Sequence, residues 1–545
     1  MRLSWRRYAQ KTMWLAAAGL SLALYSETAS AQSSAGSSQP PALLPQLGSQ
    51  GTEPFQGPIT TQGTGPALPA AKLEEWDKPL PINLAAALRL ADARPLVIAA
   101  AQAGLRQAVA EYDLAKTLWL PNVYVGASYY RHDGGNQSNS GGQIVNSKEQ
   151  FMAGAGLAAV ISTTDAIFTP LAVRQIVRSR TLDVQTARND AVLAVAEAYF
   201  NVQQARGQLA GAQDTVEKSK QLVKTVTALG TALTAPVEVD RARTQLADVE
   251  QQAALALEQW RLASADLTRV LRLMPTATIN PVEPPSLQVT LVTPHQLVDS
   301  LVPIGLTNRP ELAAQQALVQ ATLERIRQER LRPLIPSVVL GGNAAPAPGG
   351  YLAGGVYGSG VDGRGNPWTG RSDVNVQLLW ELRGLGFGNR ALVRGRQAEQ
   401  EQAVIEAFRI QDRVAAEVAQ AHAQIESAAT RVTKAEIGVK QAQINFAGNL
   451  KGMSETTRFG DLLALVNRPQ EVVASLSQLS RAYDNYYLSI NDYNRAQFRM
   501  YRALGYPSEL VACQKPIGDA IPVDTTMLPQ MAPVCAPESC VRAPQ

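Results

Sequence analysis

The sequence predicts a mostly α-helical fold with transmembrane β-strands, in which one structural unit is used twice. Two pairs of signals in the first half recur about 215 residues later: Arg94–Pro95 as Arg309–Pro310, and Leu120–Pro121 as Ile335–Pro336. In each half the signals predict a helix, then a short strand, then a very long helix without proline. A repeat of this size indicates one architectural unit used twice. Because these helices are too long for a globular core, the combination predicts a tube.

The N-terminus has the features of a secretory signal peptide. Four basic residues precede an apolar segment at 13–25 and an A-x-A cleavage site at 29–31. We therefore predict a signal peptide over 1–31 and a mature chain that begins at Gln32. No cysteine follows the cleavage site, and no later apolar run approaches the ~20 residues of a membrane helix. Any membrane embedding is therefore expected to use strands.

Charge and cysteine content exclude some functions. The precursor has a net charge of +4; removal of 1–31 takes away four basic residues and one acid, which leaves the mature chain nearly neutral. A nearly neutral chain is not expected to bind nucleic acid. Cys513, Cys535 and Cys540 all lie near the C-terminus, outside the repeat. One disulfide and one free thiol are possible there, but an odd count leaves the pairing open.

Composition and periodicity divide the mature chain. The segment after the signal peptide is rich in Ser, Gln, Gly and Pro and has no periodic apolar face, which predicts a disordered leader. The predicted parts are the leader 32–72, the first repeat 73–275, a proline-rich connector 276–300, the second repeat 301–507 and a C-terminal tail 508–545.

The first repeat is expected to begin with a helix over 84–118 that is interrupted near Pro95, since proline removes a backbone donor. A strand follows over 122–130, where apolar residues alternate with polar or mixed ones. We expect a loop over 132–146, rich in Gly, Ser and Asn, and a second strand over 151–161.

The corresponding region of the second repeat is expected to contain a longer loop, over 341–370, followed by a strand near Val376. An apolar face opposite carboxylates and amides is typical of a barrel wall between lipid and a watery lumen. A sheet packed on a soluble core is the alternative, and it is weaker because no other segment would build that core. The residues expected to face the lumen are Asn122, Tyr124, Ser128, Asp373, Asn375, Gln377 and Glu381.

Long helices make up most of the remaining chain. Apolar residues recur at steps of three and four, which indicates coiled-coil seams. The predicted helices are 171–235, 237–273, 391–450 and 461–504. Four strands per chain are too few to close a membrane barrel, and open strand edges are not tolerated in lipid. Several copies are therefore expected to pool their strands, with a helical cylinder below.

Several motifs resemble one known family. The sequence AEAY at 196–199 corresponds to AQAH at 419–422, and ARTQL lies at 242–246. Near the end of the second repeat, YNRAQ at 493–497 and ALGYP at 503–507 form another pair of motifs. Together with the double repeat, these motifs resemble the outer-membrane efflux protein family, the TolC-like channels, over about residues 80–510.

This resemblance implies a homotrimer whose twelve-stranded barrel lies in outer-membrane lipid and continues as a long α-helical barrel in the periplasm of a Gram-negative-type bacterium. It would be a passive exit duct of a tripartite efflux or type I secretion system, with a periplasmic adaptor and an inner-membrane transporter as partners. Whether the cargo is a drug, a metal or a polypeptide stays open.

In the family, acidic residues ring the constricted periplasmic end. Asp461 stands at the matching position, and Glu238 and Arg458 are further gate candidates. Three like charges would attract cations, but Asp461 could equally cap a helix. Arg458 could latch the closed state, or it could be an ordinary exposed arginine. Ala464 replaces a second acid of the family, and Pro469 is expected to break the returning helix, with Asn467 as a nearby cap.

We expect no enzyme activity, no cofactor and no metal site. The three histidines, His132, His295 and His422, lie in unrelated contexts, and no His/Cys cluster has zinc-ligand spacing. The main alternative function is a soluble periplasmic coiled-coil scaffold or adaptor without a pore. Such an adaptor would carry its helical hairpin once, whereas this chain carries it twice.

Overall fold

The computed structural model describes most of the two repeats. The described residues are 59–63, 65, 68–93, 95–120, 122–137, 140–233, 235–340, 354–361, 364–365, 369–372, 376–459 and 462–506. The predicted signal peptide, most of the predicted leader and the cysteine-containing tail lie outside these ranges.

The first repeat contains a helix pair broken at proline and two long helices. Its helices are α2 (Leu84–Ala93), α3 (Leu96–Lys116), η1 (Thr117–Trp119), α4 (Thr163–Leu233) and α5 (Pro236–Leu271). The break between α2 and α3 lies at Pro95, where it was predicted. Helix α4 begins earlier than expected and includes Pro170.

The second predicted repeat has a similar order of helices and strands. Its helices are α6 (Val298–Asn308), α7 (Pro310–Leu331), η2 (Arg383–Gly386), α8 (Phe387–Ser454) and α9 (Pro469–Ala503). Arg309 separates α6 from α7, as Pro95 and its neighbour separate α2 from α3.

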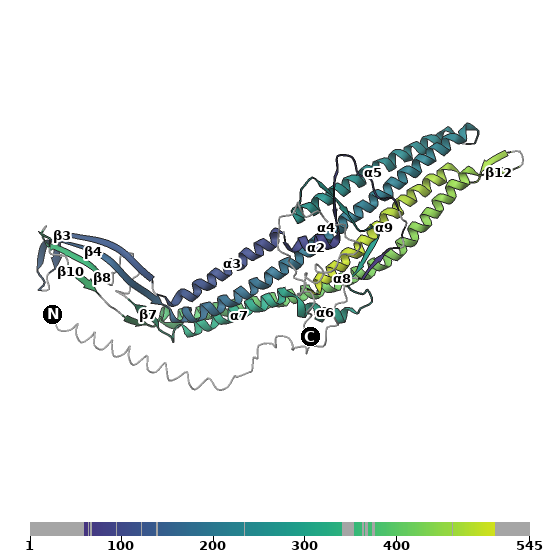
Figure 1. Cartoon of the computed structure of the whole chain (residues 1–545). Helices are drawn as coiled ribbons and strands as arrows, with labels where there is room; N and C mark the ends of the chain where they lie inside the picture. The colour runs from purple at the N-terminus through teal and green to yellow at the C-terminus, as the bar shows by residue number, and fades with distance from the viewer. Residues whose placement is uncertain are drawn as a thin grey trace, which may run out of the picture. The chain divides into compact units, whose positions relative to one another are not determined.

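Four helices form a curved layer in the order α3, α4, α7 and α8, because each contacts its neighbours in that series (Figure 1). Helix α5 returns along α4, and α9 lies between α4 and α8. Gly207 and Gly211 on α4 leave room for the rings of Tyr487 and Tyr483 on α9. The two edges of the layer are therefore α3 and α8.

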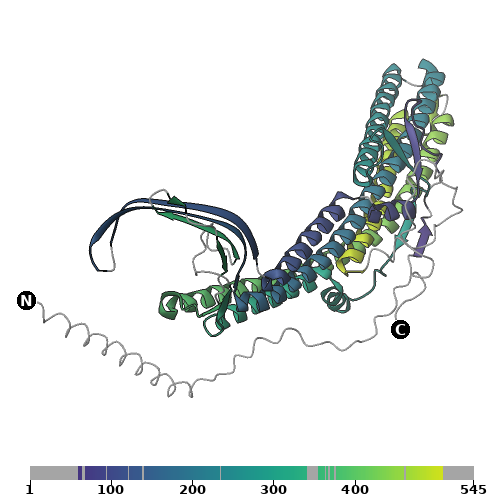
Figure 2. The same ribbon diagram turned by 60° about the vertical axis from the view of Figure 1, so that its left-hand side comes forward.

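The main sheet lies at one end of the helical layer and curves strongly (Figure 2). Its strands are β3 (Asn122–Gln137), β4 (Gln143–Ile161), β7 (Ser337–Leu340), β8 (Gly354–Val361), β9 (Arg364–Gly365), β10 (Thr369–Ser372) and β11 (Val376–Leu379). β4 pairs with β3 on one side and with β7 and β8 in succession on the other. β7 pairs with β11, and β8 with β10. β7 and β8 thus share the position next to β4, and β11 and β10 share the position beyond them. The sheet is therefore four strands wide, and all its pairs are antiparallel.

The two loops predicted in this region are wrong over much of their length. The β3–β4 ladder runs to Gln137 opposite Gln143, inside the predicted loop 132–146. β8, β9 and β10 lie inside the predicted loop 341–370. Ladder hydrogen bonds join backbone groups, so a Gly- and Asn-rich segment extends as strand when its partner also continues.

Two small sheets flank the long helices. β1 (Ile59–Gln62), in the predicted leader, pairs antiparallel with β6 (Leu287–Thr290). β2 (Lys78–Ile82) pairs parallel with β5 (Ala277–Pro281). β5 and β6 belong to the proline-rich connector, so the connector is a structured segment that joins the repeats.

The far end of the second repeat differs from its prediction. Strands β12 (Thr456–Phe459) and β13 (Leu462–Leu465) form an antiparallel hairpin between α8 and α9. The helix predicted to begin at Asp461 begins instead at Pro469, which takes the first helical position. Proline suits that position because the first backbone N–H groups of a helix have no internal partner. Within the described ranges, no helix has the length and apolar character needed to cross a membrane.

Candidate functional site

The strand register sorts the sheet into two kinds of position. Apolar residues pair with apolar residues, as Val123 does with Leu157 and Val125 with Ala155. The alternate positions include Asn122, Tyr124 and Ser128 of β3. Following the ladders through β4 and β7 puts Gln377 of β11 on the same face as these three residues.

The alternate face of β11 is apolar and solvent-accessible in the isolated chain. Val376 is 62% exposed and Leu378 55% exposed, and Tyr129 of β3 is also exposed. A single copy of the chain therefore leaves an apolar sheet face without cover, as a wall in contact with lipid would.

Three other lumen candidates do not lie on this described face. Asp373 and Asn375 lie outside the described residues. Glu381 follows β11 and forms an ion pair with Arg383, with Oε1 2.6 Å from Nε and both side chains about half exposed. Sequence alternation placed Glu381 with the strand, but the strand ends at Leu379.

The gate candidates belong to two different tips. Glu238 lies in the first turn of α5 and pairs with Arg241 at 2.7 Å. Arg458 is in β12, opposite Leu463 in the register. Asp461 lies outside the described residues, between β12 and β13 in sequence. Because α9 begins at Pro469, the helix-cap role considered for Asp461 is wrong.

The repeated motif residues hold the connector between the repeats. Tyr199 of AEAY donates a hydrogen bond to Glu283, whose other carboxylate oxygen accepts the N–H of Leu84 at 2.9 Å. Burial, and then the charge of Glu283, raise the pKa of Tyr199 well above its usual value. At the equivalent position, His422 of AQAH lies with Nε2 2.7 Å from the carbonyl oxygen of Gln296. The motif thus anchors both ends of the connector.

The YNRAQ motif fastens strand β6 to α9. Asn494 accepts the N–H of Val289 at 2.8 Å and donates to the carbonyl of Leu287 at 2.7 Å. Gln497 accepts the N–H of Val292 at 2.8 Å and donates to its carbonyl at 3.0 Å. Both side chains are fully buried, so these bonds satisfy groups that water cannot reach.

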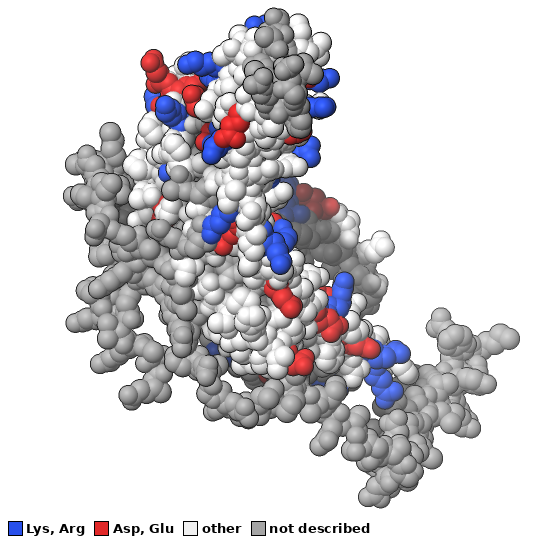
Figure 3. Space-filling view, turned by 90° about the vertical axis from the view of Figure 1, so that its right-hand side faces the viewer, with Lys and Arg blue, Asp and Glu red and all other residues white. Residues whose placement is uncertain are grey.

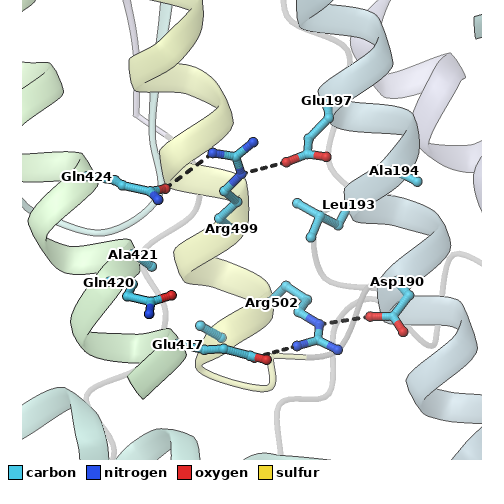
Figure 4. Close-up of a pocket in the computed structure, with 11 residues that line it drawn as sticks. Asp190, Leu193, Ala194, Glu197, Glu417, Gln420, Ala421, Gln424, Arg499 and Arg502 are labelled. Carbon is cyan, nitrogen blue, oxygen red and sulfur yellow. Dashed lines mark hydrogen bonds and ion pairs between the residues drawn. The ribbon is translucent and has the colours of Figure 1, made fainter. Parts of the chain in front are cut away.

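Three arginines on one face of α9 form a ladder that sequence reasoning missed. We call Arg495, Arg499 and Arg502 the arginine ladder; their spacing of four and three residues places them on one helix face. Figure 4 shows Arg499 and Arg502 reaching from α9 toward α4 and α8. They line a groove of about 440 Å³ together with acidic and amide side chains.

Each ladder arginine joins α9 to another helix. Arg495 donates to Gln204 on α4 at 2.8 Å. Arg499 donates to Glu197 on α4 at 2.6 Å and to Gln424 on α8 at 3.3 Å. The contacts of Arg502 are Asp190 on α4 at 2.8 Å, Glu417 on α8 at 2.7 Å and Glu311 on α7 at 3.0 Å.

Electrostatics keep this cluster charged. Burial tends to lower the pKa of Arg502, but Asp190, Glu311 and Glu417 outweigh it, and the pKa lies above its usual value. Arg309, which also pairs with Glu417, has a lowered pKa because of burial and the adjacent guanidinium of Arg502. The positive and negative side chains of the groove thus neutralise one another. Their ion pairs and hydrogen bonds hold α9 against the neighbouring helices.

Charges on the outer surface at the hairpin end are mixed. In the view of Figure 3, basic and acidic side chains are interspersed, and neither sign forms a continuous patch. This distribution agrees with the nearly neutral mature chain.

Comparison with known proteins identifies the family resemblance independently. Residues 87–271 match the sequence model described as outer membrane efflux protein. The resemblance predicted from the sequence is confirmed. No curated protein sequence matches the chain significantly.

Solved structures agree on the fold. A membrane protein from Pseudomonas aeruginosa is 16% identical with a TM-score of 0.61; the match covers 82% of this chain and 98% of that one. The MtrE outer membrane channel of Neisseria gonorrhoeae is 16% identical with a TM-score of 0.58, covering 81% and 98%. The CmeC outer membrane channel of Campylobacter jejuni is 14% identical with a TM-score of 0.57, covering 78% and 85%. The described repeats therefore have the fold of outer-membrane efflux channels.

Proposed function

We propose that the chain is one subunit of a trimeric exit duct in the outer membrane of a Gram-negative-type bacterium. Three copies pool twelve strands into a barrel, and their helices continue it through the periplasm. A periplasmic adaptor and an inner-membrane transporter deliver the substrate, and the duct conducts it without chemistry. The fold of efflux channels and the family match support this role.

The main supporting observation is the four-strand antiparallel sheet. Among the described strands, β3 pairs only with β4, while β10 and β11 pair only with β8 and β7. Both edges thus have backbone groups without a ladder partner, which lipid cannot satisfy. Its polar register face, with Asn122, Tyr124, Ser128 and Gln377, is the proposed lumen side, and we extend it to Asp373 and Asn375.

The proposed gate lies at the tips, with Asp461 as the main acidic residue and Arg458 and Glu238 as further candidates. Strands β12 and β13 occupy the segment in which a helix was predicted to begin, and α9 begins only at Pro469, after Arg468. The N-terminus of α9 is therefore not at position 461. Three copies would form a ring that favours cations.

Single-channel conductance in planar bilayers tests both parts of the proposal. We expect discrete conductances from the detergent-purified protein, and a weaker cation preference in Asp461→Ala. The matched control is Asp266→Ala, an exposed acid near the C-terminal end of α5, at the opposite end of that helix from the tip. Conductance with unchanged selectivity in Asp461→Ala would remove the gate but keep the duct. A monomer that stays soluble without detergent would instead favour the scaffold function.

A further inference from the structure

The linker between β11 and α8 has an unusual backbone. Gly384, Leu385 and Gly386 all have positive φ, at 52°, 58° and 93°. Glycine adopts this region readily, but for leucine it costs free energy and persists only where the surroundings enforce it. The linker is closed at its base, since the N–H of Arg383 donates to Asn389 at 2.8 Å.

This strained linker presents apolar side chains to solvent. Leu385 is 91% exposed, Phe387 is 72% exposed, and Leu382 is also exposed. A leucine held in a strained conformation gains nothing from that position within its own chain. A contact from outside the subunit would bury this side chain and offset that cost. We call 382–387 the knob.

The opposite edge of the chain has a matching apolar cluster. At the end of α3 and in η1, Leu114, Leu118, Trp119 and Leu120 are all exposed, Leu120 by 64%. We call 114–120 the socket. The socket leads directly into β3, and the knob directly follows β11. Both clusters thus lie at the helix-side end of the sheet, one at each open edge.

Charges on the two edges are complementary in order. Beside the socket, Asp113 pairs with Lys116 at 3.1 Å, and beside the knob Glu381 pairs with Arg383. β3 leads away from the helices and β11 leads toward them, so two copies joined at these edges run antiparallel there. Lys116 of one copy would then lie level with Glu381 of the next, and Asp113 with Arg383.

Strand number and helix order allow the same contact to repeat around a ring. Because the sheet is four strands wide, an even number, every boundary between copies can be antiparallel. The helical layer opens at α3 and α8, the elements that continue β3 and β11. Exposed apolar side chains continue along both helices, including Val109 on α3 and Phe408 on α8. A head-to-tail contact of this kind forms a ring when its rotation closes, as the proposed trimer requires.

We propose that the knob of one copy inserts into the socket of the next, and that this contact seals the junction between barrel and helices. The inference rests on the proposed oligomeric duct and assigns the residues that join its subunits. The occupant of the socket is a second copy of this chain.

Cysteine crosslinking of the full chain tests the contact directly. In a background with Cys513, Cys535 and Cys540 changed to Ser, Leu385→Cys with Trp119→Cys should give covalent oligomers on oxidation. The matched control pairs Leu385→Cys with Leu96→Cys, which is also exposed on α3 but lies about 30 Å from the socket at 1.5 Å per residue. The control pair and each single variant should give none.

A second variant separates docking from a local role. Leu385→Gly relieves the strained backbone but removes the knob side chain. A local role predicts an oligomer of equal or greater resistance to heat and SDS, whereas docking predicts a loss of resistance. Leu334→Ala, an exposed leucine outside both edges, should have no effect.

The outcomes distinguish this inference from the proposed function. Trimer-sized particles without the Leu385–Trp119 crosslink would overturn the knob contact and leave the duct in place. Quenching of a fluorophore at 385 by brominated lipid would also overturn it, since the knob would then contact the bilayer. A monomeric protein would remove both proposals.

Discussion

The returning helices of the two repeats, α5 and α9, begin alike but lie in different surroundings. They contain 36 and 35 residues, and each has proline at its first position after an extended residue. On α5, Arg241, Arg243 and Arg269 pair with acids three residues earlier in the same helix. On α9, the arginine ladder reaches α4, α7 and α8. The two helices therefore have almost the same length and the same first residue, whereas the helices packed around each one determine which ion pairs its arginines form.

The tips of the two repeats differ in the same way. In the first repeat, α4 bends at Gly230 (φ 63°, ψ −176°) and α5 follows within a few residues. In the second, β12 and β13 intervene, and Asn467 inserts against Gly452 while donating to Asn449 at 3.0 Å. One tip thus depends on backbone freedom and the other on a close side-chain contact.

Removing the last arginine of the ladder should have the largest effect. Arg502→Leu removes the cation shared by Asp190, Glu311 and Glu417 and leaves the last two with Arg309 alone, so we expect a loss of about 3 kcal/mol in unfolding free energy. The matched change on α5, Arg269→Leu, removes an exposed pair and should cost less than about 0.5 kcal/mol. Thermal unfolding followed by circular dichroism measures both. Equal shifts would show that the ladder contributes no more than a surface pair.

The connector contacts of the two helices should differ by about a factor of two. Asn494→Ala removes two buried bonds to β6, and we expect a cost of about 2 kcal/mol. Ser264→Ala on α5 removes one buried acceptor for the N–H of Ile279, at 3.1 Å, and should cost about 1 kcal/mol. Denaturant unfolding compares the two. A larger effect at Ser264 would contradict the central role of α9.

The two tip glycines should respond independently. Gly230→Ala forces a residue into a region that suits only glycine and should cost about 1 kcal/mol, with faster amide exchange near 230–236. Gly452→Ala places a Cβ 2.7 Å from the side-chain nitrogen Nδ2 of Asn467. Amide exchange should therefore rise in 456–465, and not near 230–236. Hydrogen exchange with mass spectrometry locates each change. Coupled changes at both tips would show that they act as one unit.

Acid should weaken an ion pair at each helix by a small amount. The hydrogen bond from Arg261 on α5 lowers the pKa of Asp77. Burial would raise the pKa of Asp492 on α9, but Arg495 and Arg431 lower it overall. Since both folded pKa values lie below the usual value of about 3.9, their contributions are complete above that pH and are lost as pH falls through the folded values.

The acid effect can be assigned by substitution. Asp77→Asn should reduce the decline in unfolding temperature between about pH 5 and pH 2. Near neutral pH, the slope of unfolding temperature against pH should be the same in the variant and the wild type. Thermal unfolding over this range, with the exposed Asp240→Asn as control, provides the measurement. An unchanged pH profile in Asp77→Asn would show that this carboxylate contributes nothing to the acid response.

The long elements were predictable because their signals are local. Pro95 marked the break between α2 and α3, and the apolar spacing set both ends of α8 within four residues, whereas α4 begins eight residues before its predicted start. Alternation correctly placed strands near Asn122 and Val376. The hairpin of β12 and β13 was missed, because its residues also fit a helix and only pairing between Thr456 and Leu465 distinguishes the two. β1 and β6 were missed for the same reason, since each needs a partner more than 200 residues away.

The candidate site was predictable only in part. The residue pattern indicated the polar positions of β3 and β11, and the register then brought Asn122 and Gln377 to one face. The arginine ladder has a visible spacing at 495, 499 and 502, but nothing in that spacing shows that its partners lie on three other helices. Glu381 was assigned to a strand because its polarity continues the alternation.

The sequence by itself determined the duplicated order of elements, the lengths of the helices and the apolar and polar faces of the strands. These follow from backbone geometry and side-chain periodicity, which act over a few residues. Only the tertiary structure decided the ladder partners, the strand register and the exposed, strained Leu385. The ladder partners lie far apart in the sequence, the register requires whole strands to pair, and Leu385 is held by the linker that joins the sheet to α8. The energies of these contacts exist only once the chain has folded.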